Sequence, residues 1–230
     1  MIIDHIGVFF LFDIESLRAL GRLAFPIFFF LIGYSKDFKP RWNLLLLGTI
    51  ITIFWSLTLK TWVPLDILVT AFLVKIAMQR IEKKNWDKFS NLLSLFVILT
   101  IWSLPTAFIS YGTISIMFAI CGSLKRTGTT EEQKKLCNYF ILFSVIFDFA
   151  FQSFFSSFGN NFVIVFFFIS AALWFILSNF KMKEFDIKNN LIRKTILFIS
   201  RNSLLVYCTH LVLFIYLSAI LFPDHYAAGH

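Results

Sequence analysis

The stretch LAFPIFFFLIGYSKDFKPR, residues 23–41, joins an apolar run to a short basic loop. The apolar run starts at about residue 19, and Arg22 is its only charged residue. About 20 apolar residues in a helix cross the roughly 30 Å hydrocarbon core of a bilayer, and the run is close to this length. The stretch therefore predicts a transmembrane helix that ends in a basic connection.

The composition of the whole chain also favours a membrane protein. Hydrophobic residues make up 58% of the 230 residues, the chain contains 32 Phe, and the mean hydropathy is +0.79. A soluble domain holds roughly 45 to 50% apolar residues and has too little core to bury such a surplus. The net charge of +8 does not indicate binding to nucleic acid, because the Lys and Arg residues lie between apolar runs and not on one face of an amphipathic helix. We therefore expect an integral membrane protein without a nucleic-acid partner.

Nine apolar runs divide the chain. They cover residues 2–12, 19–35, 43–59, 63–79, 89–104, 107–124, 136–155, 161–179 and 202–221. At about 1.5 Å per residue the first run reaches only about halfway across a bilayer, so the first helix is expected to be short or truncated. The fold class is predicted as all-α, a polytopic membrane helix bundle of about nine transmembrane helices in one domain.

The basic residues predict which side of the membrane each connection faces. The chain has 21 Lys and Arg residues, and all but four lie in alternate connections between the runs. These basic connections are residues 36–41, 80–88, 125–135 and 181–201. Basic loops remain in the cytoplasm. The N-terminus is therefore predicted inside and the C-terminus outside, in a multi-pass protein of the bacterial inner membrane.

The last basic connection has a helical pattern of its own. Apolar and small residues recur every fourth position and share one stripe, namely Ile187, Leu191, Thr195 and Ile199. This pattern predicts an amphipathic helix that lies along the inner membrane surface or extends the last span inward.

Polar side chains within the apolar runs are functional candidates, because a charge in the bilayer core is unfavourable unless it is paired. Once each connection is assigned to one side of the membrane, most of these polar residues fall in the middle and outer part of the bundle. Lys75 is the main exception. They are His5, Arg22, Asp66, Tyr111, Asp148, Gln152 and His210. Each one alone could also be structural, since an arginine near the interface can extend to water and a lone histidine can bond a backbone carbonyl.

His5 differs from the other polar residues because of its neighbours. Gly7 permits another helix to approach closely, and Asp4 could orient or charge the imidazole. A histidine can act as the general base that an acyl transfer needs. The cysteines lack metal-ligand spacing, so no metal is expected.

Four stretches of the chain resemble the TraX family of conjugal-transfer membrane proteins. They are MIIDHIG (1–7), LRALGRLAFPIFFFLIGYS (17–35), SYGTISIMFAICGSLKR (110–126) and RNSLLVYCTHLVLF (201–214). TraX proteins are named for acetylating the N-terminus of F-type pilin. The family is similar to a wider set of transmembrane acyltransferases that includes bacterial polysaccharide O-acetylases and heparan glucosaminide N-acetyltransferase.

The resemblance implies roles for particular residues. The DH pair of the family falls on Asp4 and His5, and its GR arginine falls on Arg22, which implies that these three form a catalytic group. The remaining positions imply substrate-binding residues, namely Tyr111, Gly112, Asp66, Asn202 and His210.

The resemblance also implies an activity for one TraX-like transmembrane acyltransferase domain over residues 1–230. Such an enzyme would move an acetyl group from cytoplasmic acetyl-CoA to an extracytoplasmic acceptor, such as the N-terminal amine of a pilin-like protein. O-acetylation of a cell-surface glycan is the alternative among enzymes, and a membrane transporter or a component of a conjugation apparatus is the alternative outside them. The expected partners are membrane lipid, acetyl-CoA and a peptide or glycan acceptor, while association into a homo-oligomer is left open.

Overall fold

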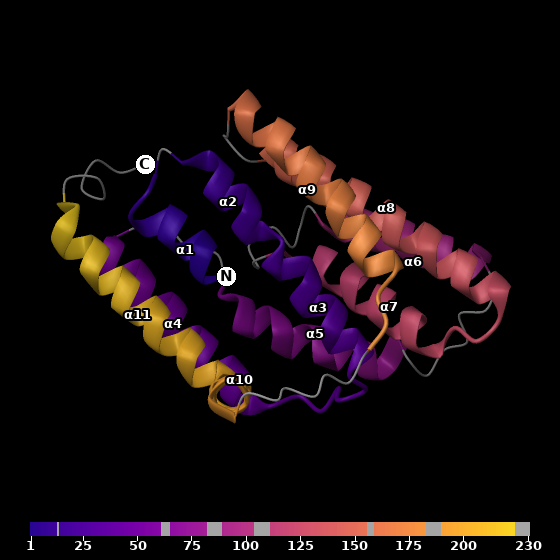
Figure 1. Ribbon diagram of the computed structural model, residues 1–230, viewed down its shortest axis with the longest axis horizontal. Coiled ribbons are helices and arrows are strands. Elements are labelled where there is room, and N and C mark those ends of the chain that lie inside the picture. Colours follow the sequence, from indigo (N-terminus) through magenta and orange to yellow (C-terminus); the bar gives the residue numbers. More distant parts are fainter. Residues whose placement is uncertain are drawn as a thin grey trace.

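A computed structural model describes residues 1–12, 14–60, 65–81, 89–103, 111–155, 159–182 and 190–223. Every regular element in these residues is a helix (Figure 1). The helices are α1 (Ile2–Phe9), α2 (Glu15–Arg22), α3 (Ala24–Tyr34), α4 (Trp42–Leu59), α5 (Ile67–Ile81), α6 (Phe89–Ser103), α7 (Ile114–Thr127), α8 (Glu131–Phe155), α9 (Asn160–Ser178), α10 (Asn190–Arg201) and α11 (Ser203–Leu221). The all-α prediction is confirmed.

Each of the nine apolar runs contains helix, but the described helices differ in length. Five are long and apolar enough to cross a membrane: Glu15–Tyr34, Trp42–Leu59, Glu131–Phe154, Asn161–Ser178 and Ser203–Leu221. Within the described residues α1 has 8 residues, α5 and α6 have 15 each, and α7 has 14. These five helices are therefore candidate membrane spans, whereas nine spans and the N-inside orientation stay predictions.

The second run is divided between α2 and α3, and Pro26 explains the division. Proline has no backbone N–H, and its ring crowds the carbonyl of the residue four positions earlier. That residue is Arg22, where α2 ends, and α3 begins at Ala24. The break therefore places Arg22 at a helix end in the interior of a 20-residue apolar segment.

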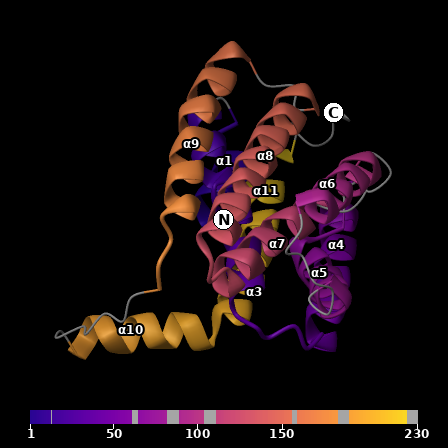
Figure 2. The same ribbon diagram turned by 90° about the vertical axis from the view of Figure 1, so that its right-hand side faces the viewer.

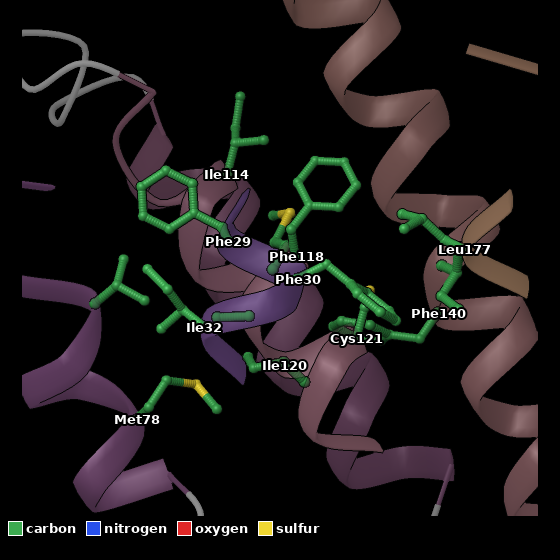
Figure 3. Close-up of a cluster of buried hydrophobic side chains, with 14 of the residues drawn as sticks. Phe29, Phe30, Ile32, Met78, Ile114, Phe118, Ile120, Cys121, Phe140 and Leu177 are labelled. Carbon is green, nitrogen blue, oxygen red and sulfur yellow. The ribbon is translucent and has the colours of Figure 1, made fainter. Parts of the chain in front are cut away.

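The centre of the bundle is the crossing of α3 and α7, which relies on two glycines. A Cβ atom on Gly33 would collide with the carbonyl of Ala119, and one on Gly122 would collide with the carbonyl of Phe30. Small residues allow this close approach, which supplies van der Waals packing where lipid gives no hydrophobic drive. Phenylalanines from both helices, including Phe29 and Phe118, fill the surrounding core (Figure 3).

The helix ends on one side of the bundle are bound by basic residues of α7. Lys125 donates to the carbonyl of Ser178, the last residue of α9. The guanidinium of Arg126 lies 3.4 Å from the carbonyls of both Gly33 and Tyr34, at the end of α3. Cations stabilise the free carbonyls and the negative dipole of a helix C-terminus. One side of the bundle is therefore its basic end.

Lys75 also reaches this basic end, from α5. Its Nζ atom donates to the carbonyl of Asp37 over 2.7 Å and lies 3.5 Å from the Asp37 carboxylate. Asp37 belongs to the connection after α3, and the charge of Lys75 lowers the pKa of its carboxyl below the ordinary value. The buried ammonium of Lys75 is thus paired, as a charge inside an apolar bundle requires.

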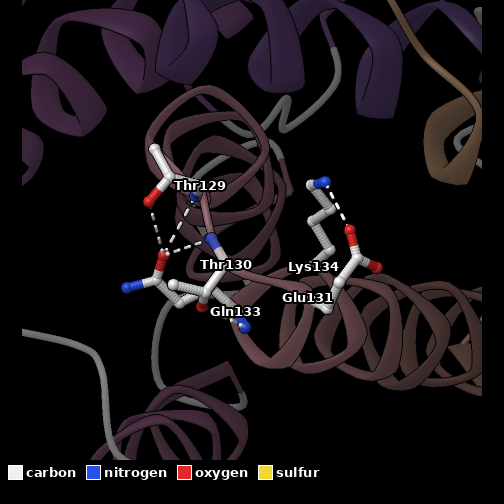
Figure 4. Close-up of polar contacts among 5 residues, drawn as sticks. All are labelled: Thr129, Thr130, Glu131, Gln133 and Lys134. Atoms are coloured by element: carbon white, nitrogen blue, oxygen red, sulfur yellow. Dashed lines mark hydrogen bonds and ion pairs between the residues drawn. The ribbon is translucent and has the colours of Figure 1, made fainter.

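The start of α8 at the basic end is fixed by a capping box. Thr130 Oγ1 accepts from the backbone N–H of Gln133 over 3.2 Å, and Gln133 Oε1 accepts from the N–H of Thr130 over 3.3 Å and from that of Thr129 over 3.0 Å (Figure 4). Lys134 adds an ion pair with Glu131 over 2.6 Å. These bonds satisfy backbone donors that the first helical turn leaves free.

Helix α10 lies across an end of the bundle, whereas α11 runs along it (Figure 2). No residue of α10 is buried, and its exposed apolar side chains include Leu191 and Ile196. The prediction of a separate amphipathic helix is therefore confirmed for residues 190–201, and an inward continuation of α11 is not what the chain forms. Ile187 lies outside the described residues.

Candidate functional site

Helices α1 and α11 lie next to each other (Figure 1). Their residues His5 and His210, which are 205 positions apart in the chain, meet between them. The Nδ1 atom of His5 lies 3.0 Å from the Nε2 atom of His210, and the two rings stack with their centroids 5.2 Å apart. The other ring nitrogen of His210, Nδ1, lies 2.8 Å from the carbonyl of Val206. Only 8% of the surface of His5 is exposed. The histidine that the sequence singles out is therefore buried and bonded to another candidate residue.

Asp66 and Tyr207 form a second polar contact beside the histidine pair. The hydroxyl of Tyr207 donates to Asp66 Oδ2 over 2.7 Å, and Asp66 Oδ1 accepts from the N–H of Leu68 over 2.8 Å. The ring of Tyr207 lies 6.0 Å from that of His5 and 5.5 Å from that of His210. Asp66 is thus anchored by protein groups near the histidines and does not extend to the interface.

Asp4 lies on the other face of α1, against α2. A Cβ atom on Gly21 would overlap the Cβ and main chain of Asp4, so the two helices approach closely there. Gly7 makes a looser contact, since a Cβ atom would lie 2.9 Å from Cγ of Arg18. Asp4 Oδ1 is buried without a hydrogen-bond partner among the described residues, and Arg18 and Arg22 interact with it electrostatically. The expected close approach at Gly7 is confirmed, with Gly21 as the tighter contact.

Arg22 is hydrogen-bonded to a pair of polar side chains on α8. Its Nη1 atom donates to Gln152 Oε1, and Gln152 Nε2 donates to Asp148 Oδ1 over 2.9 Å. Gln152 and Asp148 are 4% and 3% exposed, and the guanidinium lies 5.9 Å from the ring centroid of Phe162. Arg22 therefore binds inside the bundle, and it takes partners different from those of His5.

Tyr111 and Gly112 form a turn immediately before α7. Both have positive φ angles, 64° and 41°, a region that is unfavourable for tyrosine and available to glycine. The ring of Tyr111 stacks on Phe25 with centroids 3.7 Å apart, and its hydroxyl interacts electrostatically with Arg22. The turn thus places Tyr111 near the guanidinium of Arg22.

Asn202 is the predicted site residue that the structure leaves apart from the others. Its side chain donates to the carbonyl of Phe198 over 2.9 Å, between α10 and α11. It lies eight residues before His210, which is about 12 Å along a helix. Its role as a substrate-binding residue stays a prediction.

The contacts identify three participants to which the sequence assigned no role. Tyr207 lies one helical turn before His210 and therefore on the same face of the helix, and this spacing is the signal in the sequence that points to it. Asp148 and Gln152 were recognised as polar residues within a run, and their four-residue spacing places them on one face of α8. No group of three or more His, Cys, Asp or Glu side chains that could hold a metal ion occurs among the residues the structure describes.

The helices and the buried polar contacts define a polytopic membrane protein with polar groups inside its bundle. The sequence comparisons identify its family: the TraX protein family matches residues 1–124, more than half of the chain. The chain therefore belongs to the TraX family, as its motifs predicted. The matched part includes His5, Arg22, Asp66 and Tyr111, and it ends before α8.

A relative of nearly the same length supports a relationship beyond residue 124. An uncharacterised protein of Rickettsia prowazekii (strain Madrid E) is 26% identical over an alignment of 224 residues, which covers 93% of this chain and 85% of the relative. No solved structure matches the chain.

Proposed function

We propose that this protein is a membrane-embedded acetyltransferase that moves an acetyl group from cytoplasmic acetyl-CoA to an extracytoplasmic acceptor amine, such as a pilin-like N-terminus. The observation that carries the proposal is the buried contact of His5 with His210, at a motif position of the TraX family. A buried imidazole held by another side chain is suited to general-base or nucleophilic catalysis. The whole chain acts as one acyltransferase domain in this proposal.

The reaction needs a proton acceptor and a group that stabilises negative charge. His5 removes a proton from the acceptor amine, whose nitrogen attacks the thioester carbonyl. The C–S bond then breaks, and the CoA sulfur takes the proton from His5 and leaves as a thiol. The tetrahedral intermediate carries negative charge, which a preorganised cation offsets strongly where water is excluded. This proposal assigns that charge to Arg22, which bonds Gln152 inside the bundle and interacts electrostatically with Asp4, the residue before His5.

The membrane orientation is part of the proposal, with the basic end of the bundle facing the cytoplasm. Three basic side chains donate to backbone carbonyls at this end, namely those of Lys125, Arg126 and Lys75. Basic segments are retained on the cytoplasmic side of a membrane. The proposal also includes nine spans, an N-terminus inside, and a location in the bacterial inner membrane. Cysteine-accessibility labelling should find position 134 cytoplasmic and position 160 external, and the reverse pattern would contradict the proposal.

The activity is tested with the purified protein in lipid nanodiscs and acetyl-CoA labelled in its acetyl group. The acceptors are a pilin-like peptide with a free N-terminal amine and the same peptide with that amine blocked. We expect transfer to the free amine only, loss of transfer in His5→Ala and Arg22→Lys, and normal transfer in His225→Ala, which makes the same chemical change in the C-terminal tail. Lysine keeps the charge of Arg22 but not its planar fork of donors.

Three outcomes would overturn parts of the proposal. Acetylation of a glycan hydroxyl in place of the amine would exclude the proposed acceptor while retaining the transferase. Full activity of a folded His5→Ala protein would remove His5 from the reaction. An absence of acetyl-CoA hydrolysis, binding and transfer would favour a transporter or a structural component.

A further inference from the structure

The hydrogen bonds of His210 determine which of its ring nitrogens carries a proton. Nδ1 lies 2.8 Å from the carbonyl of Val206, and a carbonyl can only accept, so Nδ1 must be the donor. A neutral imidazole has one N–H, which leaves Nε2 of His210 as an acceptor. Both nitrogens then have protein partners, so His210 has none left for the substrate-binding role predicted from the sequence.

The same reasoning fixes the proton of His5. Its Nδ1 atom lies 3.0 Å from the accepting Nε2 of His210, so Nδ1 of His5 donates and carries the ring proton. Nε2 of His5 consequently has a free electron pair. The rings of Phe9 and Tyr207, with centroids 6.2 and 6.0 Å away, pack beside this imidazole.

We propose that His210 is a positioning residue that holds His5 in the tautomer with the proton on Nδ1, so that Nε2 of His5 is the atom that reacts. This inference rests on the proposed function for its catalytic meaning. When Nε2 takes the proton of the acceptor amine, the positive ring donates a stronger, charge-assisted bond to His210. His210 accepts that bond and does not itself carry the proton onward.

The proposal distinguishes two substitutions of similar polarity. The amide oxygen of glutamine can occupy the place of Nε2 of histidine, whereas that of asparagine reaches only the place of Nδ1. His210→Gln can therefore still accept from His5, while His210→Asn and His210→Leu cannot. If His210 carried the proton onward, glutamine would fail as well, because an amide does not exchange protons in this way.

The tautomer is measured first, because this measurement does not depend on activity. Nitrogen-15 NMR of histidine-labelled protein in nanodiscs, at a pH where the histidines are neutral, reports which ring nitrogen is protonated. The signals of His5 are assigned by their absence in His5→Ala. We expect proton occupancy on Nδ1 of His5 in the wild type and in His210→Gln, and a mixture of tautomers in His210→Leu. Occupancy on Nε2 in the wild type, or no change in His210→Leu, would overturn the inference.

Kinetics then test whether the tautomer matters for transfer. We expect His210→Leu and His210→Asn to lower kcat by about 10²-fold or more, as loss of a tautomer-fixing partner does in other enzymes, with little change in the KM for acetyl-CoA. His210→Gln should restore kcat to within about tenfold of the wild type. Equal activities of the glutamine and asparagine variants would refute the positioning role. If the wild type transfers nothing, the proposed function fails while the NMR result still decides the tautomer.

Discussion

Two polar links join the N-terminal helices to later ones, and they differ in charge. His5 of α1 meets His210 of α11 through neutral rings surrounded by aromatic side chains. Arg22 of α2 meets Gln152 and Asp148 of α8, so this link contains a guanidinium and a carboxyl group. Neutral groups are much less unfavourable to bury than charges, which must remain paired. The comparison indicates that the first link is suited to proton transfer, whereas the second holds the bundle together and sets the local charge.

Helix α1 connects the two links. His5 faces α11, while the next residue back, Asp4, packs against Gly21 of α2, one residue before Arg22. Consecutive residues of a helix point in directions about 100° apart, so one short helix can contact both neighbours. The positions of α1 and α2 relative to each other therefore decide whether the two links act on one reacting group.

The largest effect is expected from Gly21→Ala. The added methyl group would overlap the main chain of Asp4, so α1 must move and His5 must lose its alignment. A displacement of about 1 Å at a reacting group lowers the rate by roughly 10²-fold, and we expect at least this loss of acetyl transfer.

Gly7→Ala is the matched control for this change. Its methyl group would lie 2.9 Å from Cγ of Arg18, so the close contact is with a side chain, while the main-chain nitrogen of Arg18 would lie at 3.7 Å, an ordinary contact distance. We expect transfer within about tenfold of the wild type, as measured with the same labelled acetyl-CoA. Equal losses in the two variants would show that the close contact at Gly21 does not position His5.

Arg22→Ala tests whether the charged link holds the bundle together. It removes the cationic donor of a buried hydrogen bond to Gln152, and hydrogen bonds that involve a charged group contribute about 1.5–3 kcal/mol. The free energy of unfolding in mixed micelles, measured by titration with a denaturing detergent, should fall by about this amount.

Arg41→Ala serves as the control for loss of an arginine in an exposed pair. The Arg41 side chain is 70% exposed and lies 3.1 Å from Asp37. Exposed ion pairs contribute about 1 kcal/mol at most, so the control should stay close to the wild type. A loss for Arg22→Ala no larger than that for Arg41→Ala would contradict a stabilising role for the charged link.

A double-mutant cycle with His210→Leu and Gln152→Leu sharpens the comparison further. If the two links are separate, their effects on the free energy of unfolding should add within about 0.5 kcal/mol. The pair His5→Leu and His210→Leu, which removes both partners of one contact, should deviate from additivity by more than this. A large coupling between His210 and Gln152 would show that the links form one network.

The sequence predicted the elements of this structure better than their partners. Apolar runs placed the helices because the bilayer demands continuous apolar segments, and the separate helix at residues 190–201 followed from its stripe of apolar residues. The break at Arg22 follows from Pro26 four residues later, whereas the tight contact at Gly21 depends on the neighbouring helix α1. Periodicity shows which face a side chain occupies and does not show which helix covers it.

The candidate site illustrates the same limit. Motif positions identified Asp4, His5, Arg22 and His210, and suggested that the first three act together. The contact of His5 with His210 joins residues 205 positions apart, a pairing that no local pattern in one sequence encodes. Tyr207 became a candidate only through the bond it makes. Gln152 was a candidate because it lies in an apolar run, and its partner Arg22 became known only from the structure.

The smallest effect is expected where a polar contact faces water, at Asp37 in the connection after α3. Lys75 and Arg41 lower the pKa of its carboxyl relative to the unfolded chain. The stabilisation is therefore present above the unfolded value of about 4 and is lost as the pH falls through the lower folded value. The carboxyl is 43% exposed, and screening by solvent limits the effect to about 1 kcal/mol or less. Asp37→Asn should accordingly reduce the loss of stability between about pH 5 and pH 2, measured by detergent unfolding across that range. The variant should remain folded, because the backbone carbonyl of residue 37 still accepts from Lys75 Nζ over 2.7 Å. An unfolded Asp37→Asn protein would contradict this view of the basic end. It would mean that the buried ammonium of Lys75 is held in place by the water-facing carboxylate and not by the backbone carbonyl.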